Sequence, residues 1–221
     1  MGRIVNKGKP LAGAAVGAAQ KSRSPDTFLG DFKAATDSKG VFRIPNLPAE
    51  DVLMLYGLMD SLRPQGAIAA RAVRTGASRS EVDMGDIDVT PGFRCSGTVV
   101  LKDGKQVPAG TRILLSRMEA WDHQIGDVDK EGAFRFTGLP KETYTLSVHV
   151  AGYYLSPRNV SRCPLNTFHL LGVVAEDIEG LRVLFEPGQE PESGPSDNES
   201  DQKRFREFDK RHKTKLQGAP G

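Results

Sequence analysis

One segment of this chain occurs twice, and it constrains the fold more than any other feature. Residues Thr36–Pro48 return about ninety residues later as Val128–Pro140. Six of the thirteen positions are identical, namely an Asp, a Gly, a Phe-Arg pair and a closing Leu-Pro. Two copies at this spacing predict two tandem domains of the same fold, each about the size of a small β-sandwich.

Within each copy the residues have the chemistry of a tight turn followed by a strand. The Asp can accept hydrogen bonds from the backbone just after it, and the Gly adopts the positive φ that such a turn needs. The Phe then alternates with polar neighbours, as on a half-buried strand. We therefore predict a structural hairpin in each copy, built on Asp37, Gly40 and Phe42 in the first and on Asp129, Gly132 and Phe134 in the second.

The rest of the chain, rich in Gly and Pro with short apolar runs, predicts an all-β protein of two tandem β-sandwiches. The domains are placed at residues 2–89 and 91–186, and the short junction Thr90–Gly92 should restrict their relative orientation. A loop is expected at Lys21–Asp31. Strands are expected in the first domain at Gly2–Asn6, Ala14–Gln20, Phe32–Thr36, Val41–Ile44, Val52–Leu58, Ala67–Val73 and Ile87–Val89. Strands are expected in the second domain at Arg94–Leu101, Thr111–Arg117, Gln124–Val128, Ala133–Thr137, Glu142–Val150 and Leu181–Phe185.

Composition and charge exclude several classes of partner. The net charge of +2 is too small to favour nucleic acid as a partner, and no apolar stretch reaches the roughly 20 residues of a membrane span. The tail, residues 187–221, is acidic and then basic without a packed apolar pattern, so we expect it to be disordered. A short amphipathic helix that binds a partner is the alternative within its basic part. The first residues lack a signal peptide and read directly as a strand, which suggests a piece of a longer protein; a complete cytoplasmic protein is the alternative.

The repeated motif supports a resemblance to a known family. Both units resemble the carboxypeptidase regulatory-like domain, a β-sandwich related to transthyretin and to the starch-binding-like fold. The resemblance implies two tandem antiparallel seven-stranded Greek-key β-sandwiches. The first copy matches the family at Gly2, Pro10, Gly13, Val16, Thr36, Asp37, Gly40, Phe42, Leu47 and Pro48. The second copy matches it at Gly97, Val99, Pro108, Gly110, Asp129, Gly132, Phe134, Leu139, Pro140, Tyr144 and Leu146. Glu142 departs from the family's usual Gly, and Val52 departs from its usual Tyr.

The resemblance implies a domain that accompanies catalytic modules and does no chemistry itself. The chain also looks like tandem regions of large bacterial cell-envelope proteins, some of which carry a membrane metallopeptidase. Its four histidines are scattered, with no zinc-peptidase spacing, nucleophile elbow or phosphate-binding loop. We therefore expect no enzyme activity, no metal and no cofactor.

Exposed aromatic residues are the best candidates for ligand contact. Trp121, Asp122 and His123 precede the second hairpin, and Tyr153 and Tyr154 form a second group. A flat indole can stack on a sugar face, so these residues predict a carbohydrate site. The alternative is that Trp121 covers the edge of the sandwich and one of the tyrosines fills the core.

Two further sequence features leave alternatives open. Cys95 and Cys163 flank the second domain and permit a disulfide, although two unreactive thiols remain the alternative. Asn159-Val160-Ser161 matches a glycosylation sequon, a pattern that often arises by chance.

Together these observations predict a non-catalytic module of a bacterial envelope protein, located outside the cytoplasm if it belongs to a longer protein. Its expected role is protein–protein contact or spacing, with a protein or polysaccharide partner at the envelope. A carbohydrate-binding module that uses Trp121 is one alternative. The sensing end of a longer membrane receptor or metallopeptidase is the other.

Overall fold

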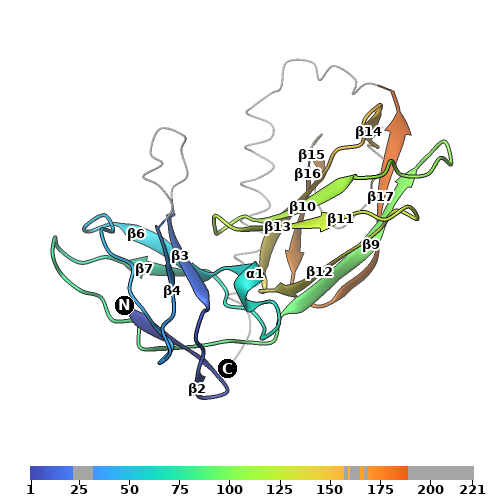
Figure 1. Cartoon of the computed structure of the whole chain (residues 1–221). Helices are drawn as coiled ribbons and strands as arrows, with labels where there is room; N and C mark the ends of the chain where they lie inside the picture. Colours follow the sequence, from blue (N-terminus) through green and yellow to red (C-terminus); the bar gives the residue numbers. More distant parts are fainter. Residues whose placement is uncertain (22–31, 157–158, 160–164, 167–168, 189–221) are drawn as a thin grey trace, which may run out of the picture. The chain divides into compact units, whose positions relative to one another are not determined.

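The computed structural model describes residues 1–21, 32–156, 159, 165–166 and 169–188 (Figure 1). Most of the predicted loop at Lys21–Asp31, Cys163 and nearly all of the predicted tail lie outside these residues. Residues Met1–Gly188 form one compact unit. Within it we call residues 1–89 the N-terminal half and residues 90–188 the C-terminal half.

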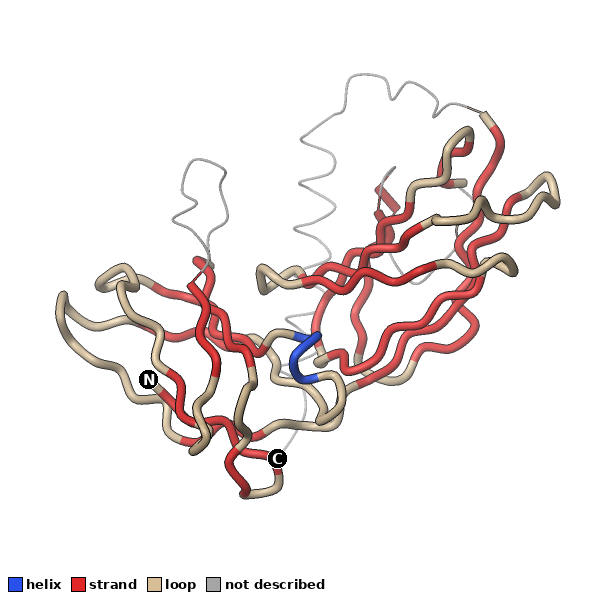
Figure 2. The backbone as a smooth tube through the Cα atoms, in the orientation of Figure 1, coloured by secondary structure: helices blue, strands red, loops and turns tan. Residues whose placement is uncertain are grey.

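The regular secondary structure of the described residues is almost entirely β, with one short helix (Figure 2). The N-terminal half contains β1 (Gly2–Asn6), β2 (Lys9–Pro10), β3 (Ala15–Gln20), β4 (Phe32–Ala35), β5 (Val41–Phe42), β6 (Val52–Gly57), α1 (Met59–Leu62), β7 (Arg71–Arg74) and β8 (Asp86–Asp88). The C-terminal half contains β9 (Phe93–Leu101), β10 (Arg112–Arg117), β11 (His123–Asp127), β12 (Ala133–Leu139), β13 (Glu142–Val148), β14 (Tyr153–Leu155), β15 (Leu165–Asn166), β16 (His169–Val174) and β17 (Ile178–Pro187).

Each half consists of two sheets with apolar residues between them, which confirms the predicted β-sandwich fold. In the N-terminal half the sheets have the orders β2-β1-β5, with β8 also on β1, and β4-β3-β6-β7. In the C-terminal half the orders are β11-β10-β13-β16-β15 and β12-β9-β17-β14. The described halves thus have eight and nine strands rather than seven, because short edge strands of two or three residues, β2 in the N-terminal half and β14 and β15 in the C-terminal half, extend the sheets.

The first and last strands of each half pair in parallel, unlike the fully antiparallel sheets predicted. β8 runs parallel to β1, and β17 runs parallel to β9, whereas the other pairings between described strands are antiparallel. In both halves the strand before the last lies in the opposite sheet, so the chain crosses between the sheets before it pairs with the first strand. A tight turn would have forced the antiparallel arrangement.

The repeated turn forms in both halves, but it does not join a hairpin. Asp37 Oδ1 accepts from the backbone N–H of Val41 at 2.9 Å, and Asp129 Oδ1 accepts from that of Ala133 at 2.7 Å. The strands on either side then enter different sheets, since β4 pairs with β3 while β5 pairs with β1. β11 and β12 likewise pair with β10 and β9. The predicted hairpins are therefore connections between the two sheets of each sandwich.

The Gly and Phe of the repeated motif fix this connection against the first strand. The carbonyl of Gly40 accepts from the N–H of Ile4 at 2.8 Å, and that of Gly132 accepts from Val99 at 2.8 Å. A Cβ on Gly132 would lie 2.2 Å from the carbonyl oxygen of Val99, so this position excludes a side chain. Phe42 and Phe134, two residues on, are buried in the two cores.

The two cores meet at α1. Leu62 of this single helical turn packs into the N-terminal core, while Met59 packs into the C-terminal core with Tyr144 and Leu139. The sequence reading did not predict α1, because a four-residue helix is too short to show a helical period.

Candidate functional site

The most unusual group of side chains in the chain surrounds Arg117, at the end of β10. Alternation along this strand directs Ile113, Leu115 and Arg117 inward, and the side chain of Arg117 is 0% exposed. A buried arginine is costly unless its charge and its five N–H donors are matched. Its partners therefore define the site.

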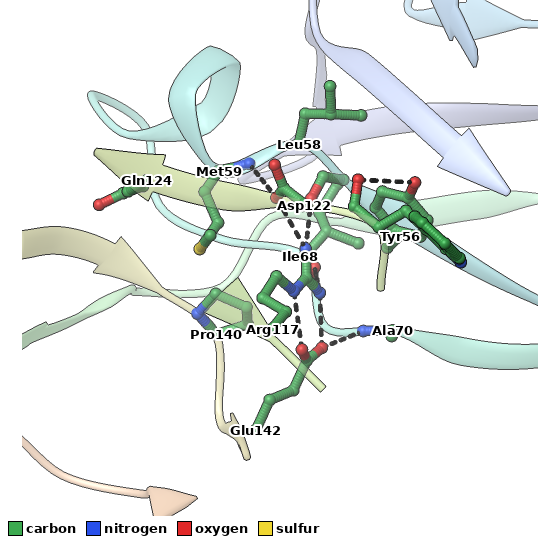
Figure 3. A network of polar contacts seen from close by, with 12 residues as sticks. Tyr56, Leu58, Met59, Ile68, Ala70, Arg117, Asp122, Gln124, Pro140 and Glu142 are labelled. Carbon is green, nitrogen blue, oxygen red and sulfur yellow. Dashed lines mark hydrogen bonds and ion pairs between the residues drawn. The ribbon is translucent and has the colours of Figure 1, made fainter. Parts of the chain in front are cut away.

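Glu142, the first residue of β13, matches the charge (Figure 3). Arg117 Nε donates to Oε2 at 2.7 Å and Nη2 donates to Oε1 at 2.5 Å, a bidentate pair. The Glu142 side chain is 4% exposed. Burial lowers the pKa of Arg117, but the hydrogen bonds and charge of Glu142 outweigh that effect and hold the pKa above its usual value. Arg117 therefore keeps its charge although it is desolvated.

The remaining donors of Arg117 reach the N-terminal half. Nη1 donates to the carbonyl oxygen of Gly57 at 2.7 Å, and Nη2 donates to that of Ile68 at 3.3 Å. Glu142 Oε1 in turn accepts from the backbone N–H of Ala70. Both members of the ion pair, the guanidinium and the carboxylate, therefore form hydrogen bonds with the backbone of the N-terminal half.

Asp122 completes the network from the loop before β11. Its Oδ2 accepts from the N–H of Met59 at 2.8 Å and lies 3.3 Å from Arg117 Nη1. Burial raises the pKa of this carboxyl, and the bonds to Met59 and Arg117 offset part of that rise. Asp122, in the C-terminal half, therefore fixes the first residue of α1, which belongs to the N-terminal half.

Aromatic and sulfur contacts surround these charges. The Arg117 guanidinium lies 5.4 Å from the centre of the Tyr56 ring, a cation–π geometry, and Tyr56 Oη donates to the carbonyl of Trp121 at 3.3 Å. Tyr144 Oη donates to the carbonyl of Pro140 at 2.9 Å and lies 4.0 Å from Met59 Sδ. Burial raises the pKa of Tyr144, so this hydroxyl stays protonated. We call Arg117, Glu142, Asp122, Tyr56 and Met59 the junction cluster.

The structure places the five predicted ligand residues in two groups with different surroundings. Trp121 is 42% exposed, and His123 begins β11 with an exposed side chain, but the Asp122 side chain between them is 9% exposed and belongs to the junction cluster. Tyr153 and Tyr154 belong to β14 in the other sheet, where their hydroxyls donate to Asp103 at 2.9 Å and to Glu186 at 3.3 Å. The carboxylate of Asp122 therefore interacts with Met59 and Arg117 within the protein.

Sequence reasoning did not identify Arg117, Glu142 or Met59 as a group. One signal was available, because an arginine at an inward position of an alternating strand needs a buried acid. In the sequence, Glu142 stands out only as a departure from the usual Gly of the family that the chain resembles. The partners of Arg117 and Glu142 in the N-terminal half cannot be recognised from residue type, because Gly57, Ile68 and Ala70 contribute only backbone atoms.

Two other predicted features have defined places. Cys95 is buried on β9, and burial raises the pKa of its thiol to about 11. Cys163 lies outside the described residues, so the pairing of the two cysteines stays a prediction. The side chain of Asn159, the sequon residue, is buried and hydrogen bonds to both backbone groups of Leu184, with its Nδ2 donating at 2.8 Å and its Oδ1 accepting at 2.7 Å. This amide is a structural group that ties residue 159 to β17.

Within the described ranges, no group of three or more His, Cys, Asp or Glu residues is arranged to hold a metal ion. Among those same residues, no helix has the length and apolar character needed to cross a membrane.

Comparisons with known proteins give distant structural likenesses. No protein-family model matches the chain, and no curated protein matches it. Among solved structures it is similar to a minor pilin of Streptococcus agalactiae, with 14% identity, a TM-score of 0.39, and 87% of this chain and 98% of that chain covered. A streptococcal ancillary pilin shows 15% identity and a TM-score of 0.39, with 86% of this chain and 62% of that chain covered. The shaft pilin of Lactobacillus rhamnosus GG shows 12% identity and a TM-score of 0.30, with 86% and 97% covered. With TM-scores below 0.5, these likenesses carry no argument about the function of this chain.

Proposed function

We propose that this chain is a non-catalytic module of a bacterial envelope protein, built of two carboxypeptidase regulatory-like sandwiches, that acts as a rigid spacer and presents its surface to protein partners. The junction cluster is the observation that carries the proposal. The envelope setting and the family assignment rest on the resemblance of the repeated motif.

The rigidity follows from the hydrogen bonds that cross the junction. Moving one half away from the other would separate Arg117 and Glu142 from the backbone groups of Gly57, Ile68 and Ala70. Each hydrogen bond to a charged group contributes about 1.5–3 kcal/mol. A cost of about 3 kcal/mol limits a separated arrangement to less than about 1% of molecules. A spacer needs this property, because its ends must keep a fixed distance.

A distance measurement between the halves tests the spacer function. Spin labels at Lys39 and Lys130, both exposed on the repeated turns, report that distance in a chain with Cys163→Ser. We expect one narrow distance distribution, which Arg117→Met broadens and which the surface change Arg94→Met leaves unaltered. A broad distribution in the unmodified chain would refute the rigid spacer.

Envelope location is tested separately. We expect an antibody against the chain to detect it in the envelope fraction of its source cells, in a form that added protease degrades without cell lysis. Detection in the cytoplasmic fraction alone would remove this part of the proposal.

The exposure of Trp121 favours a second candidate function, carbohydrate binding. Trp121 and Ile125 are both exposed large apolar residues near the start of β11, so they provide a matched pair of variants. Trp121→Ala should abolish retention on polysaccharide gels with little change in melting temperature, whereas Ile125→Ala should not change retention. Equal retention of the unmodified chain and Trp121→Ala would exclude Trp121 as the contact.

A further inference from the structure

Strand β11 is an edge strand of the five-stranded sheet in the C-terminal half (Figure 1). Among the described residues it pairs with β10 alone, so no described strand covers its other side. An uncovered edge presents backbone N–H and C=O groups that can pair with another strand. The residues of β11 therefore determine which strand fits this edge.

Hydrogen bonds near the two ends of β11 show which of its residues face the open edge. The N–H of Arg117 donates to the carbonyl of Asp122 at 3.0 Å. The N–H of Val128 donates to the carbonyl of Thr111, also at 3.0 Å. Along an antiparallel pair, residues whose backbone groups bond to the neighbouring strand alternate with residues whose backbone groups point away from it. The residues of β11 whose backbone groups point to the open edge are therefore His123, Ile125 and Asp127.

The side chains of these same three residues lie on the outer face of the sheet. All three are exposed, whereas Gln124 between them is buried. Ile125 is 54% exposed, the highest value among the exposed large apolar residues of the described chain. It lies opposite Leu114 of β10, which is half-buried, so the two form a short apolar row. Covering this row with another strand would remove apolar surface from water.

The order of these residues makes the edge complementary to a second copy of itself. If two copies of β11 pair antiparallel across a two-fold axis at Ile125, each His123 lies opposite Asp127 of the other copy. Each of the three residue pairs then exchanges two backbone hydrogen bonds, because these are the residues whose backbone groups face the edge. On the outer face, Ile125 meets Ile125 at the centre and an imidazole faces a carboxylate on either side. The apolar row then extends to Leu114 of both copies.

The other edge strand on this side of the sandwich, β12, does not fit itself in this way. Among the described strands it pairs with β9 alone. The carbonyl of Gly132 accepts from the N–H of Val99, so Ala133 and Arg135 direct their backbone groups to the open edge. Arg135 is exposed at the centre of this strand. Antiparallel pairing of two copies of β12 at Arg135 would place two guanidinium groups opposite each other, which is unfavourable. Of these two edges, β11 is the one that is complementary to itself.

We propose that β11 is a homodimerisation edge, at which a second copy of this chain adds its own β11 antiparallel about a two-fold axis at Ile125. The five-stranded sheets of the two copies then form one continuous sheet across the axis. A pairing of single strands buries less than the roughly 1,200–2,000 Å² of a standard interface, so we expect a weak dimer with a Kd on the order of 10–100 µM. This inference goes beyond the proposed function and does not depend on it, because His123, Ile125 and Asp127 lie outside the junction cluster.

Sedimentation velocity over a concentration series tests the self-association of the full chain, with Cys163→Ser to exclude dimers linked by that thiol. We expect monomer at about 1 µM and mostly dimer at about 500 µM. Ile125→Asp places two carboxylates at the axis, so it should weaken the dimer about tenfold or more while leaving the melting temperature nearly unchanged. Val173→Asp, a matched change at an exposed apolar residue of β16, should leave the dimer intact.

An exchange of charges tests the antiparallel register. His123→Glu alone sets a carboxylate opposite Asp127 of the other copy, and Asp127→Lys alone sets an ammonium group opposite His123. Each single change should therefore weaken the dimer. The two changes combined place opposite charges in both pairs again and should restore dimerisation. A general attraction between copies would not show this recovery.

A disulfide between copies locates the axis directly. The Cα atoms of a hydrogen-bonded antiparallel pair lie about 5.5 Å apart, within the range of a disulfide. In the Cys163→Ser chain, Ile125→Cys should therefore give a covalent dimer under mild oxidation, whereas Val173→Cys should not. A chain that stays monomeric at every concentration, including one whose edge is covered by another segment or another protein, would overturn the proposal. So would a dimer that Ile125→Asp does not weaken, or one that the combined charge exchange does not recover.

Discussion

Replacement of Arg117 by Met should be among the most destabilising single changes in this chain. Methionine keeps the length and apolar stem of the side chain, so little volume is lost. The Glu142 carboxylate, 4% exposed, would then lack its counter-ion, and the carbonyls of Gly57 and Ile68 would lose their donors. Removing one partner of a buried ion pair costs about 3–5 kcal/mol. For a folded unit of this size, that loss lowers the melting temperature by about 6–20 °C.

Urea unfolding followed by tryptophan fluorescence measures the loss, because Trp121 lies beside the junction cluster and is the single Trp of the chain. Arg94→Met is the matched control. Arg94 forms a similar pair with Asp177, but at the surface, where the two side chains are 51% and 35% exposed. An exposed pair contributes about 1 kcal/mol or less, so this control should unfold almost as the unmodified chain does.

A second variant distinguishes an ionic from a packing effect. In Arg117→Met combined with Glu142→Leu, no uncompensated charge remains at this pair, so the double variant should be more stable than Arg117→Met alone. If Arg117→Met costs less than about 1 kcal/mol, or if the two changes add without coupling, the junction is not desolvated and the reasoning fails.

Three further outcomes are expected. Gly132→Ala should destabilise the fold by more than Gly104→Ala, measured by urea unfolding. Both glycines have a positive φ, but a Cβ on Gly104 would have no atom within 4 Å, while a Cβ on Gly132 would lie 2.2 Å from a carbonyl oxygen of β9. Equal losses would show that backbone strain alone matters at these turns. Met59→Ala should lower the free energy of unfolding by about 2–4 kcal/mol and reduce the hydrogen-exchange protection of β12 and β13. Unchanged protection of these strands would contradict the packing of Met59 in the C-terminal core. Because the folded pKa of Cys95 is raised from 9.0 to about 11, the stability of a Cys163→Ser chain should fall as pH rises from 9.0 to about 11, and Cys95→Ala should remove that dependence.

Local patterns predicted most of the strands before β14, because the residues that define them are close together in sequence, but they predicted none of β14, β15 and β16. Gly2–Asn6 was predicted with the bounds that the structure has, and Arg94–Leu101 differs by one residue at its start. The turn chemistry of Asp37 and Asp129 was also predicted. The sheets that the flanking strands join could not be predicted, since a tight turn can close a hairpin or connect two sheets with the same residues.

The junction cluster could not be predicted, because its contacts join distant segments. Arg117 meets backbone groups about fifty to sixty positions earlier, and those groups have the same chemistry in every residue. Asp122 was predicted to face a ligand because it lies between Trp121 and His123. Its burial depends on Arg117 and on the N–H of Met59, neither of which any local pattern connects to it.

The parallel pairing of first and last strands has a mechanical consequence. The chain enters each half at one end of a sheet and leaves it at the other end, on an adjacent strand. A force that pulls these ends apart slides the two strands along each other, so all hydrogen bonds between them bear the load at once instead of opening one by one. The pairing of β1 with β8 extends from Arg3 to Val5, whereas that of β9 with β17 extends from Cys95 to Leu101. Under tension the N-terminal half should therefore yield first, and the C-terminal half should remain folded.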